Sequence, residues 1–234
     1  MDQVPDLVPD LVLVSPVATP GGPRHEWREM GLYDRYVLPR VLDLVMRGKP
    51  VMRQRAKVVP LARGRVLEVG IGSGLNLSFY DKSRIEKVLG LDPSPELQVM
   101  ARKRAAEAGI DVDWLALSSE RIPLPDNSVD SIVITYTMCT IPDVATALSE
   151  MARVMKPGAP MYFSEHGLAP DASVRKWQNR LNPWWGKISG GCNINRNVPA
   201  LLESAGLLIR QIDTMYLPGP RPLTFNYWGS AEKA

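Results

Sequence analysis

Three glycines follow an apolar run in the N-terminal half of the chain. Residues 66–76 read VLEVGIGSGLN, with Gly70, Gly72 and Gly74 placed directly after a predicted strand. Glycine permits a sharp turn and lets the backbone approach a ligand without an intervening Cβ. Eighteen residues after Gly74, a second apolar run ends in Asp92, whose carboxylate can accept hydrogen bonds from two ribose hydroxyls. The two features together predict a site for an adenosine-containing cofactor, whereas the glycines alone would fit a mere tight turn.

The residues around these glycines indicate which adenosine cofactor is bound. A dinucleotide site needs the pattern G-x-G-x-x-G and a helix N-terminus that faces a pyrophosphate, but the order here is EVGIGSG. Glu68 precedes the glycines, and a carboxylate at this point disfavours phosphate while it suits a ligand with an ammonium and a sulfonium group. The sequence therefore predicts S-adenosylmethionine as the cofactor.

Short apolar runs alternate with helical stretches in the part of the chain that carries these residues. The predicted strands are 65–69, 87–92, 112–117, 131–136 and 160–165, and the predicted helices between them are 75–80, 95–108 and 143–155. This order is typical of a parallel, doubly wound sheet. After a helix at 197–205, strands at 207–217 and 223–229 flank LPGPRP, whose three prolines predict the turn of a closing antiparallel hairpin.

Four motifs resemble those of the class I methyltransferase family in order and spacing. They are EVGIGSG, LGLDPS, LPDNSVDSIVIT and RVMKPGAPMYFSEH, and the resemblance extends from about residue 30 to the end of the chain. It implies an S-adenosylmethionine-dependent methyltransferase. It also implies an α/β fold with a Rossmann-like, doubly wound, seven-stranded sheet, mostly parallel with an antiparallel C-terminal strand. We therefore expect a single methyltransferase domain over residues 24–234.

The resemblance also assigns cofactor contacts to particular residues. The candidate cofactor-binding residues are Tyr33, Glu68, Gly70, Ile71, Gly72, Gly74, Asn76, Asp92, Pro93, Ser94, Ser119, Glu120 and Thr135. The glycine segment would line the methionyl part, Asp92 the ribose, and Pro93 with Ser94 the adenine edge. Many relatives carry an Asp at the adenine amino group, but alignment places Ser118 there, so a backbone amide or Ser119 replaces it. Glu120 is either a contact or a surface residue.

In this family the methyl acceptor usually lies over the ends of the fourth and fifth strands. The candidate catalytic residues in those segments are His166, Glu165 and Cys139. The ordinary pKa of histidine, about 6.5, suits proton transfer near neutral pH, but His166 can equally pack against or orient the substrate. Glu165 could orient His166 or cap a helix. Cys139 is either a buried inert thiol or a group that binds a sulfur substrate.

A tryptophan-rich insert follows the fifth strand. The candidate substrate-binding residues, most of them in this insert, are Tyr136, Trp177, Trp185, Cys192, Asn195 and Arg196. The tryptophans could form an apolar lid over the acceptor or pack in the core. The double glycine before Cys192 would let the backbone pass close to a ligand, and Asn195 or Arg196 could instead cap a helix that starts near Asn197.

The order SEHG, WQ, NPWW, GGCNINR and LPGPRPLTFNYWG resembles a subgroup that includes alkyl-thiol S-methyltransferases and their bacterial relatives. A thiol acceptor fits, because a thiol of pKa about 8.5 is already partly ionised at neutral pH and needs no strong base. We therefore expect sulfide or a small alkyl thiol as acceptor. The alternatives are an N-methyltransferase of phospholipid head groups or other lipophilic amines, and a cofactor-binding regulator without turnover.

Composition limits the remaining possibilities. The net charge of +3 is too small for a general nucleic-acid binder, and the spacing of the two cysteines predicts neither a disulfide framework nor a metal site. No apolar run is long enough to span a membrane, so we expect a cytoplasmic protein. The sequence assigns no oligomeric state. Residues 1–23, with five prolines, predict a disordered leader, or alternatively a lid or docking strand.

The segment that follows the leader is helical in pattern and basic. Apolar residues recur at three- and four-residue intervals over residues 26–47, which predicts a helix that Pro39 splits or kinks. Residues 24–57 hold nine Arg or Lys and four acidic residues. This excess indicates a solvated helical face, or else weak contact with anionic lipid head groups or with an acidic substrate.

Overall fold

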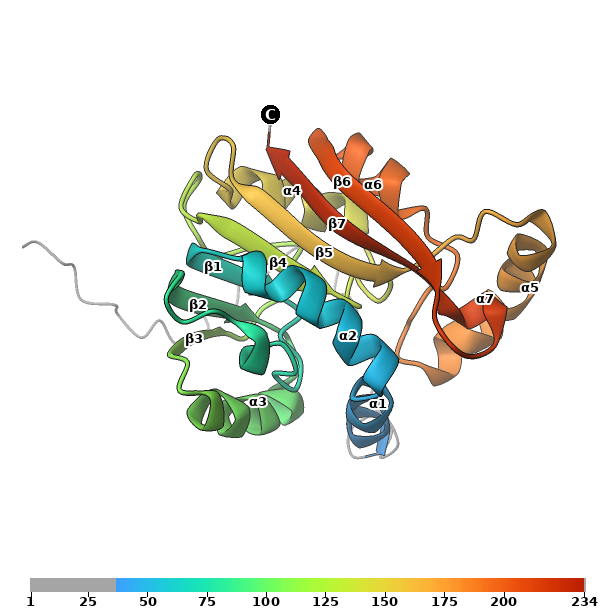
Figure 1. Ribbon diagram of the computed structural model, residues 1–234, viewed down its shortest axis with the longest axis horizontal. Helices are drawn as coiled ribbons and strands as arrows, with labels where there is room; N and C mark the ends of the chain where they lie inside the picture. The colour runs from blue at the N-terminus through green and yellow to red at the C-terminus, as the bar shows by residue number, and fades with distance from the viewer. Residues whose placement is uncertain (1–36, 234) are drawn as a thin grey trace, which may run out of the picture. The chain divides into compact units, whose positions relative to one another are not determined.

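A seven-stranded sheet forms the centre of the protein (Figure 1). The computed structural model describes residues 37–233. The strands are β1 (Gly64–Val69), β2 (Ile85–Leu91), β3 (Val112–Leu115), β4 (Ser131–Thr135), β5 (Pro160–His166), β6 (Leu207–Tyr216) and β7 (Phe225–Lys233). Their order is β3-β2-β1-β4-β5-β7-β6, with β1 to β5 parallel and β7 antiparallel to both of its neighbours. The predicted fold class is therefore confirmed.

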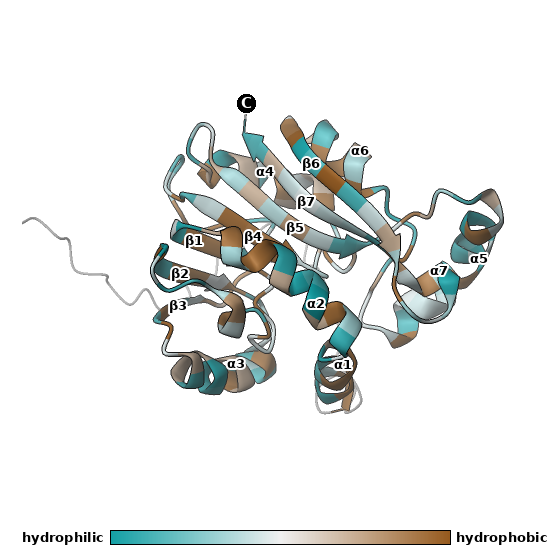
Figure 2. Ribbon diagram, viewed as in Figure 1, coloured by the Kyte–Doolittle hydropathy of each residue, from teal (hydrophilic) through white to brown (hydrophobic). Residues whose placement is uncertain are grey.

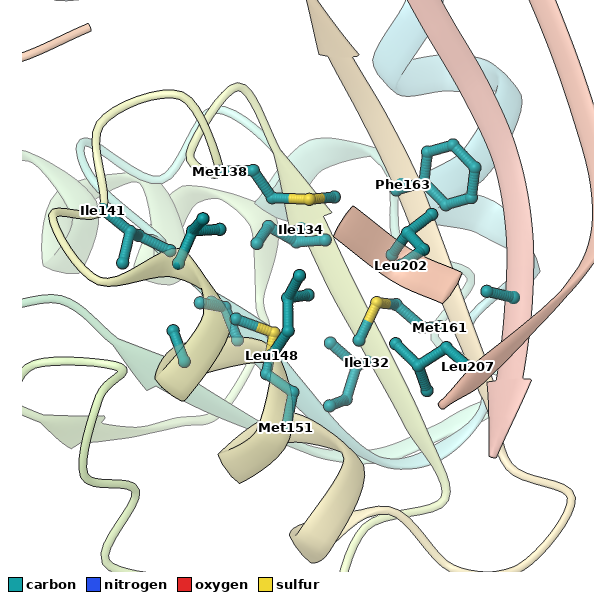
Figure 3. Close-up of a cluster of buried hydrophobic side chains, with 14 of the residues drawn as sticks. Ile132, Ile134, Met138, Ile141, Leu148, Met151, Met161, Phe163, Leu202 and Leu207 are labelled. Carbon is teal, nitrogen blue, oxygen red and sulfur yellow. The ribbon is translucent and has the colours of Figure 1, made fainter. Parts of the chain in front are cut away.

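Helices cover both faces of this sheet. They are α1 (Leu38–Met46), α2 (Lys49–Val58), α3 (Pro95–Ala108), α4 (Val144–Val154), α5 (Ala172–Ile188), α6 (Val198–Ser204) and α7 (Arg221–Thr224), with 3-10 turns η2 (Val59–Leu61) and η3 (Leu77–Phe79). One core lies between the strands and helices α4 and α6, where Leu148 and Leu202 meet Ile132 and Met161 (Figure 3). A second core lies on the opposite face, under α2, α3 and η3.

The central strands contain continuous apolar runs because both of their faces are covered. All five residues of β4 are buried, whereas β6 at the edge of the sheet is mostly exposed. Figure 2 accordingly shows hydrophobic colour concentrated in the middle strands and a mixed pattern along β6. Continuous apolar runs are the sequence signature of parallel strands buried on both sides. This is why the strand pattern could be predicted from the sequence.

Local signals explain which helix predictions are confirmed. Helix α3 has the predicted bounds because Ser94 caps its N-terminus through Leu97 N and Gly109 ends it in a left-handed conformation. The helix predicted at 75–80 is wrong, since only the 3-10 turn η3 forms there. Within the described residues, Pro39 lies in the first turn of α1, where its missing N–H is harmless.

Helix α5 occupies the insert that the sequence pattern left without secondary structure. It runs over 17 residues and contains Pro183 within its length. All described residues belong to one compact unit. The leader predicted at 1–23, the helical pattern at 26–36 and Tyr33 lie outside the described residues. Among residues 37–233, no helix combines the length and apolar character that crossing a bilayer requires.

Candidate functional site

The glycine loop after β1 turns sharply and packs against the loop after β4. Gly70, Gly72 and Gly74 have φ values of +70°, +53° and +81°, a region that favours glycine. A Cβ on Gly70 would lie 2.3 Å from the side chain of Thr137, so only glycine fits there. A Cβ on Gly72 would meet nothing closer than 3.8 Å, so the loop leaves space at this residue. The loop is therefore closed toward Thr137 and open beside Gly72.

Substitution of Gly70 by alanine is expected to destabilise the protein more than substitution of Gly158. Gly158 has a matching φ of +68°, but a Cβ there would meet nothing within 4 Å. Both variants bear the conformational cost of a left-handed alanine, about 1–2 kcal/mol. Gly70→Ala adds a clash with Thr137, worth a further 1–3 kcal/mol or so. Denaturant unfolding of both variants measures this difference, and equal stabilities would contradict the close packing at Gly70.

Asp92 closes the other side of the loop. Its Oδ2 accepts the Gly72 N–H and its Oδ1 accepts the Ser94 N–H, both at 2.8 Å. Burial raises the pKa of this carboxyl. Each carboxylate oxygen can accept a further hydrogen bond, so the side chain keeps capacity for two hydroxyls. Pro93 is exposed beside it, and the side chain of Ile71 points into the core, which leaves only its backbone for a ligand.

A buried polar network lies behind the glycine loop. Glu68 accepts hydrogen bonds from Asn76 Nδ2 at 3.0 Å and Tyr80 Oη at 2.8 Å. Arg55 Nη1 donates to Asn76 Oδ1 at 2.8 Å and to Thr135 Oγ1 at 2.5 Å. The network therefore connects α2, β1 and β4, and it fixes three predicted cofactor-binding residues (Glu68, Asn76 and Thr135) in place. Direct contact of Glu68 with the cofactor stays a prediction.

The burial of Glu68 predicts a dependence of stability on pH. Burial raises the pKa of Glu68 to about 7 from an ordinary 4.5. Stability contributed by the neutral carboxyl is present below the unfolded pKa and is lost as pH rises through the folded pKa. The isosteric Glu68→Gln variant lacks this loss, so its unfolding free energy should rise relative to wild type by about 3 kcal/mol between about pH 4.5 and 7.

Chemical denaturation at several pH values measures this effect. Glu203→Gln, at an exposed position of α6, is the control and should follow wild type throughout. A constant difference in unfolding free energy between wild type and Glu68→Gln over this range would show that the folded protein does not raise the pKa of Glu68.

Helix α1 is fastened to the glycine loop by a charged cluster. Asp43, buried on α1, accepts a hydrogen bond from Ser73 Oγ at 2.6 Å and pairs with Arg104 of α3 at 2.7 Å. Arg104 also donates to the Ser73 carbonyl at 2.6 Å. The N-terminal helix thus lies directly against the loop that would hold the cofactor. The apolar residues Val41, Leu44 and Val45 of α1 are exposed.

The predicted adenine-side residues form a tight turn of their own. Ser119 is buried. Glu120 Oε2 accepts from Ser118 Oγ at 2.7 Å, and its Oε1 accepts the Asp143 N–H at 2.9 Å, at the start of α4. Glu120 is therefore held by the protein and is not a solvated surface residue. The role of Ser119 and Glu120 toward adenine stays a prediction.

The ends of β4 and β5 lie next to each other beside the glycine loop, as predicted. Tyr136 follows β4 with a φ of +54°, uncommon for a tyrosine, and its ring lies 6.5 Å from that of His166. Its hydroxyl is buried beside Ser164 without a hydrogen bond to it, and burial raises the pKa of Tyr136 to about 12. Glu165 Oε1 accepts the N–H groups of Thr137 and Met138 at 2.8 and 3.1 Å. Glu165 therefore shapes the loop after β4.

Glu165 keeps one oxygen unused. Its Oε2 is buried and has no hydrogen-bond partner, and burial raises the pKa of this carboxyl to about 7. Neighbouring strand residues point to opposite faces, so Glu165 does not contact the imidazole of His166 by a hydrogen bond in the described structure. The prediction that Glu165 could orient His166 or cap a helix is thus replaced by a role in holding backbone amides.

Two cysteines and a histidine come together at this edge of the sheet. The ligand-type atoms of Cys139, His166 and Cys192 all lie within 4.8 Å of one another, and Cys192 Sγ is 3.1 Å from His166 Nε2. Both thiols are buried and neither forms a disulfide. Although burial disfavours an imidazolium, the neighbouring Cys192 raises the pKa of His166. We call these three residues the Cys-His-Cys cluster; their distance in sequence had predicted no such group.

The residues predicted to bind substrate divide into two sets. Trp185 packs on the two cysteines, and Arg196 Nη2 donates to the Ile141 carbonyl at 2.7 Å, so both lie at the cluster. Trp177 is 54% exposed on α5, so its role as a lid residue stays a prediction. Asn195 points away, with its Nδ2 bonded to Asn179 at 2.9 Å. Neither Asn195 nor Arg196 caps α6, because Asn197 does so through Ala200 N.

Comparison with known proteins places the fold and the glycine loop in one family. A sequence family described as "Methyltransferase domain" matches residues 67–163. The thiol S-methyltransferase TMT1B of Rattus norvegicus is 33% identical over 144 residues, or 60% of this chain and 58% of that protein. The phosphatidylethanolamine N-methyltransferase of Cereibacter sphaeroides is 33% identical over 129 residues, 53% and 63% of the two chains.

The crystal structure of an S-adenosylmethionine-dependent methyltransferase from Aquifex aeolicus has the same fold, with a TM-score of 0.58 and 20% identity over 84% of this chain and 98% of that one. The chain is thus similar to class I methyltransferases in both sequence and fold. It spans about three fifths of the length of the curated relatives it matches. The comparisons support S-adenosylmethionine as the cofactor, and the open backbone at Gly72 beside Asp92 fits its ribose.

The segment that matches the family model ends before the Cys-His-Cys cluster is complete, since His166 and Cys192 follow residue 163. Sequence reasoning also missed Arg55, which it had grouped with a basic surface segment. The guanidinium is buried, and it lies 5.2 Å from the ring centre of Tyr136. The one sequence signal for its burial is its position three residues before Val58, which places both on the same face of α2.

Proposed function

We propose that this protein transfers the methyl group of S-adenosylmethionine to a small thiol. The observation that carries the proposal is the place of the Cys-His-Cys cluster. It lies at the ends of β4 and β5, and the loop that bears Cys139 also carries Thr137, the residue packed against Gly70. A sulfur acceptor bound at the cluster would thus lie close to the methionyl end of the cofactor. The likeness to thiol S-methyltransferases supports the same acceptor.

The chemistry asks for alignment more than for strong acid or base groups. The thiolate sulfur attacks the methyl carbon in line with the sulfonium, a new S–CH₃ bond forms, and the cofactor leaves as S-adenosylhomocysteine. Asp92 and the glycine loop hold the cofactor. Glu165 fixes the backbone of Thr137 and Met138 where the cofactor site meets the acceptor site. We call these two parts the cofactor half-site and the acceptor half-site. His166 and the cysteines provide the polar end of the acceptor site, and Trp185 its apolar wall.

A panel of acceptors tests the proposal. The protein is incubated with S-adenosylmethionine and, separately, sulfide, methanethiol, a longer alkyl thiol or vesicles that contain phosphatidylethanolamine. We expect S-adenosylhomocysteine to form together with the methylated thiol, and the rate to depend on thiol concentration. Product from the amine lipid alone would contradict the proposal. Tight cofactor binding with no product from any acceptor would instead identify a regulator.

One observation favours a second candidate, methyl transfer to a phospholipid amine. Glu165 Oε2 is buried without a partner, so this carboxylate has the capacity to accept a hydrogen bond from an ammonium group. The similarity to a phosphatidylethanolamine N-methyltransferase fits this candidate. The basic segment supports it less than the sequence suggested, because Arg55 is buried in the network behind the glycine loop. The acceptor panel separates the two candidates.

A further inference from the structure

We propose that Cys139, His166 and Cys192 bind a zinc ion whose fourth coordination position receives the acceptor thiol. The metal site stands on the geometry of the three side chains. The assignment of its fourth position rests on the proposed function.

The three ligand atoms already lie near the positions that zinc requires. Zinc bonds of about 2.3 Å to sulfur and about 2.0–2.1 Å to nitrogen, in a tetrahedron, place ligand atoms roughly 3.5–3.8 Å apart. Here the three atoms lie within 4.8 Å of one another, with Cys192 Sγ and His166 Nε2 at 3.1 Å. Small side-chain rotations would bring all three to bonding distance. Two thiolates and one imidazole with an open position form a donor set known for catalytic zinc.

The surroundings hold the ligands in place before any metal binds. The backbone of Leu223 lies beside the His166 ring, and Nε2 faces Cys192. Asn193 donates from both its backbone and its side chain to the Cys139 carbonyl, at 2.8 and 3.1 Å. These bonds tie together the two loops that carry the cysteines. Metal-binding histidines commonly have a backbone carbonyl near the second ring nitrogen.

A glycine turn also supports this loop pairing. Gly190 and Gly191 both have positive φ, at +67° and +86°, immediately before Cys192. The turn they form brings the cysteine back toward β5. Arg196 fastens the opposite loop by donating to the carbonyls of Met138 and Ile141. Its guanidinium also places one positive charge near the buried sulfurs and Glu165. With a divalent cation and two thiolates, the charges at this edge would balance.

A zinc ion at this site would bind the acceptor thiol and favour its thiolate form. The thiol R–SH binds at the fourth position, a zinc–sulfur bond forms, and the proton passes to solvent. The bound thiolate then attacks the methyl carbon, so an S–CH₃ bond forms while the sulfonium C–S bond breaks. The product thioether is neutral and a weaker ligand, so it leaves the metal and S-adenosylhomocysteine leaves the cofactor site.

Metal analysis of the full, tag-free chain tests the site. We expect about one zinc per chain by plasma mass spectrometry after zinc loading and gel filtration. Cys139→Ser, Cys192→Ser and His166→Gln should each reduce this content at least tenfold. His25→Gln, which removes the other histidine of the chain, should retain it. Calorimetric binding of S-adenosylmethionine shows that each variant is folded.

Three results would overturn the metal site. The first is wild-type protein that stays below a tenth of one zinc per chain while both thiols react rapidly with a thiol reagent. The second is an intact mass lower by two hydrogens, which would show that the two cysteines form a disulfide instead. Equal zinc in wild type and in the folded cluster variants would also place the metal elsewhere.

Cobalt substitution tests the fourth position without an activity readout. Tetrahedral cobalt gives visible d–d bands and near-ultraviolet charge-transfer bands from each sulfur ligand. Methanethiol should intensify the charge-transfer band in the cobalt protein, whereas methanol should not. An unchanged spectrum at thiol concentrations that support methylation would overturn the assignment of the thiol to the metal.

Activity measurements separate the zinc site from the proposed function. Metal-free protein that methylates thiols at the full rate would overturn the zinc inference and leave the proposed function standing. A zinc-loaded protein with no thiol product would refute the proposed function.

Discussion

Alanine at His166 is expected to lower turnover with a thiol acceptor by about 100-fold or more, while binding of S-adenosylmethionine changes little. His166 Nε2 lies 3.1 Å from Cys192 Sγ at the acceptor half-site, and the imidazole makes none of the described contacts to the glycine loop or Asp92. Loss of the ring therefore removes a group at the sulfur acceptor and leaves the cofactor half-site intact. Steady-state rates and calorimetry on the same preparation measure the two effects.

His25→Ala is the matched control, because it removes the other histidine of the chain. Added imidazole should restore part of the activity of His166→Ala, which a purely structural defect would not allow. The measurements should extend from about pH 6 to about pH 9, a range that brackets the ordinary pKa values of imidazole and thiol. If His166→Ala keeps wild-type rates over that range, the residue serves packing only.

Alanine at Asp92 is expected to weaken S-adenosylmethionine binding by roughly 5- to 150-fold, which corresponds to about 1–3 kcal/mol. The side chain holds Gly72 N and Ser94 N at 2.8 Å, so its loss both removes the ribose acceptor and loosens the glycine loop. Asp92→Asn keeps the size of the side chain but offers one acceptor oxygen fewer. It should fall between wild type and Asp92→Ala.

Isothermal titration calorimetry measures these affinities. Asp113→Ala is the control and should bind the cofactor as wild type does. Asp113 is an exposed residue of β3 that pairs with Lys87 of β2. An unchanged dissociation constant for Asp92→Ala would remove the ribose assignment. A loss of affinity that accompanies global unfolding would show instead that Asp92 serves the fold, so thermal denaturation accompanies each titration.

The sheet could be predicted because its signals are local. Buried parallel strands are continuous apolar runs, and Ser94, Pro95 and Gly109 mark the ends of α3. The cofactor half-site could be predicted for the same reason, since the glycine loop and Asp92 end neighbouring strands at one edge of the sheet. Helix 75–80 failed because Gly74 and the buried turn of Leu77 favour a tight 3-10 turn over a full helix.

The acceptor half-site was only partly predictable because it depends on long-range contacts. Cys139 and Cys192 are separated by 53 residues and are brought together by contacts such as that of Asn193 with the Cys139 carbonyl. The tryptophans illustrate the same limit. Trp177 and Trp185 were predicted together as a lid or as core residues, but Trp177 is exposed whereas Trp185 packs on the cysteines. Without the helix, their faces could not be assigned.

Transfer of a labelled methyl group tests the central claim most directly. The protein is supplied with S-adenosylmethionine that carries a trideuterated methyl group and with methanethiol, and the volatile product is analysed by mass spectrometry. The proposed function predicts trideuterated dimethyl sulfide in an amount equal to the S-adenosylhomocysteine formed, with a rate that falls sharply in His166→Ala. Label that appears only in a lipid amine, or cofactor that is bound but never consumed, would contradict it.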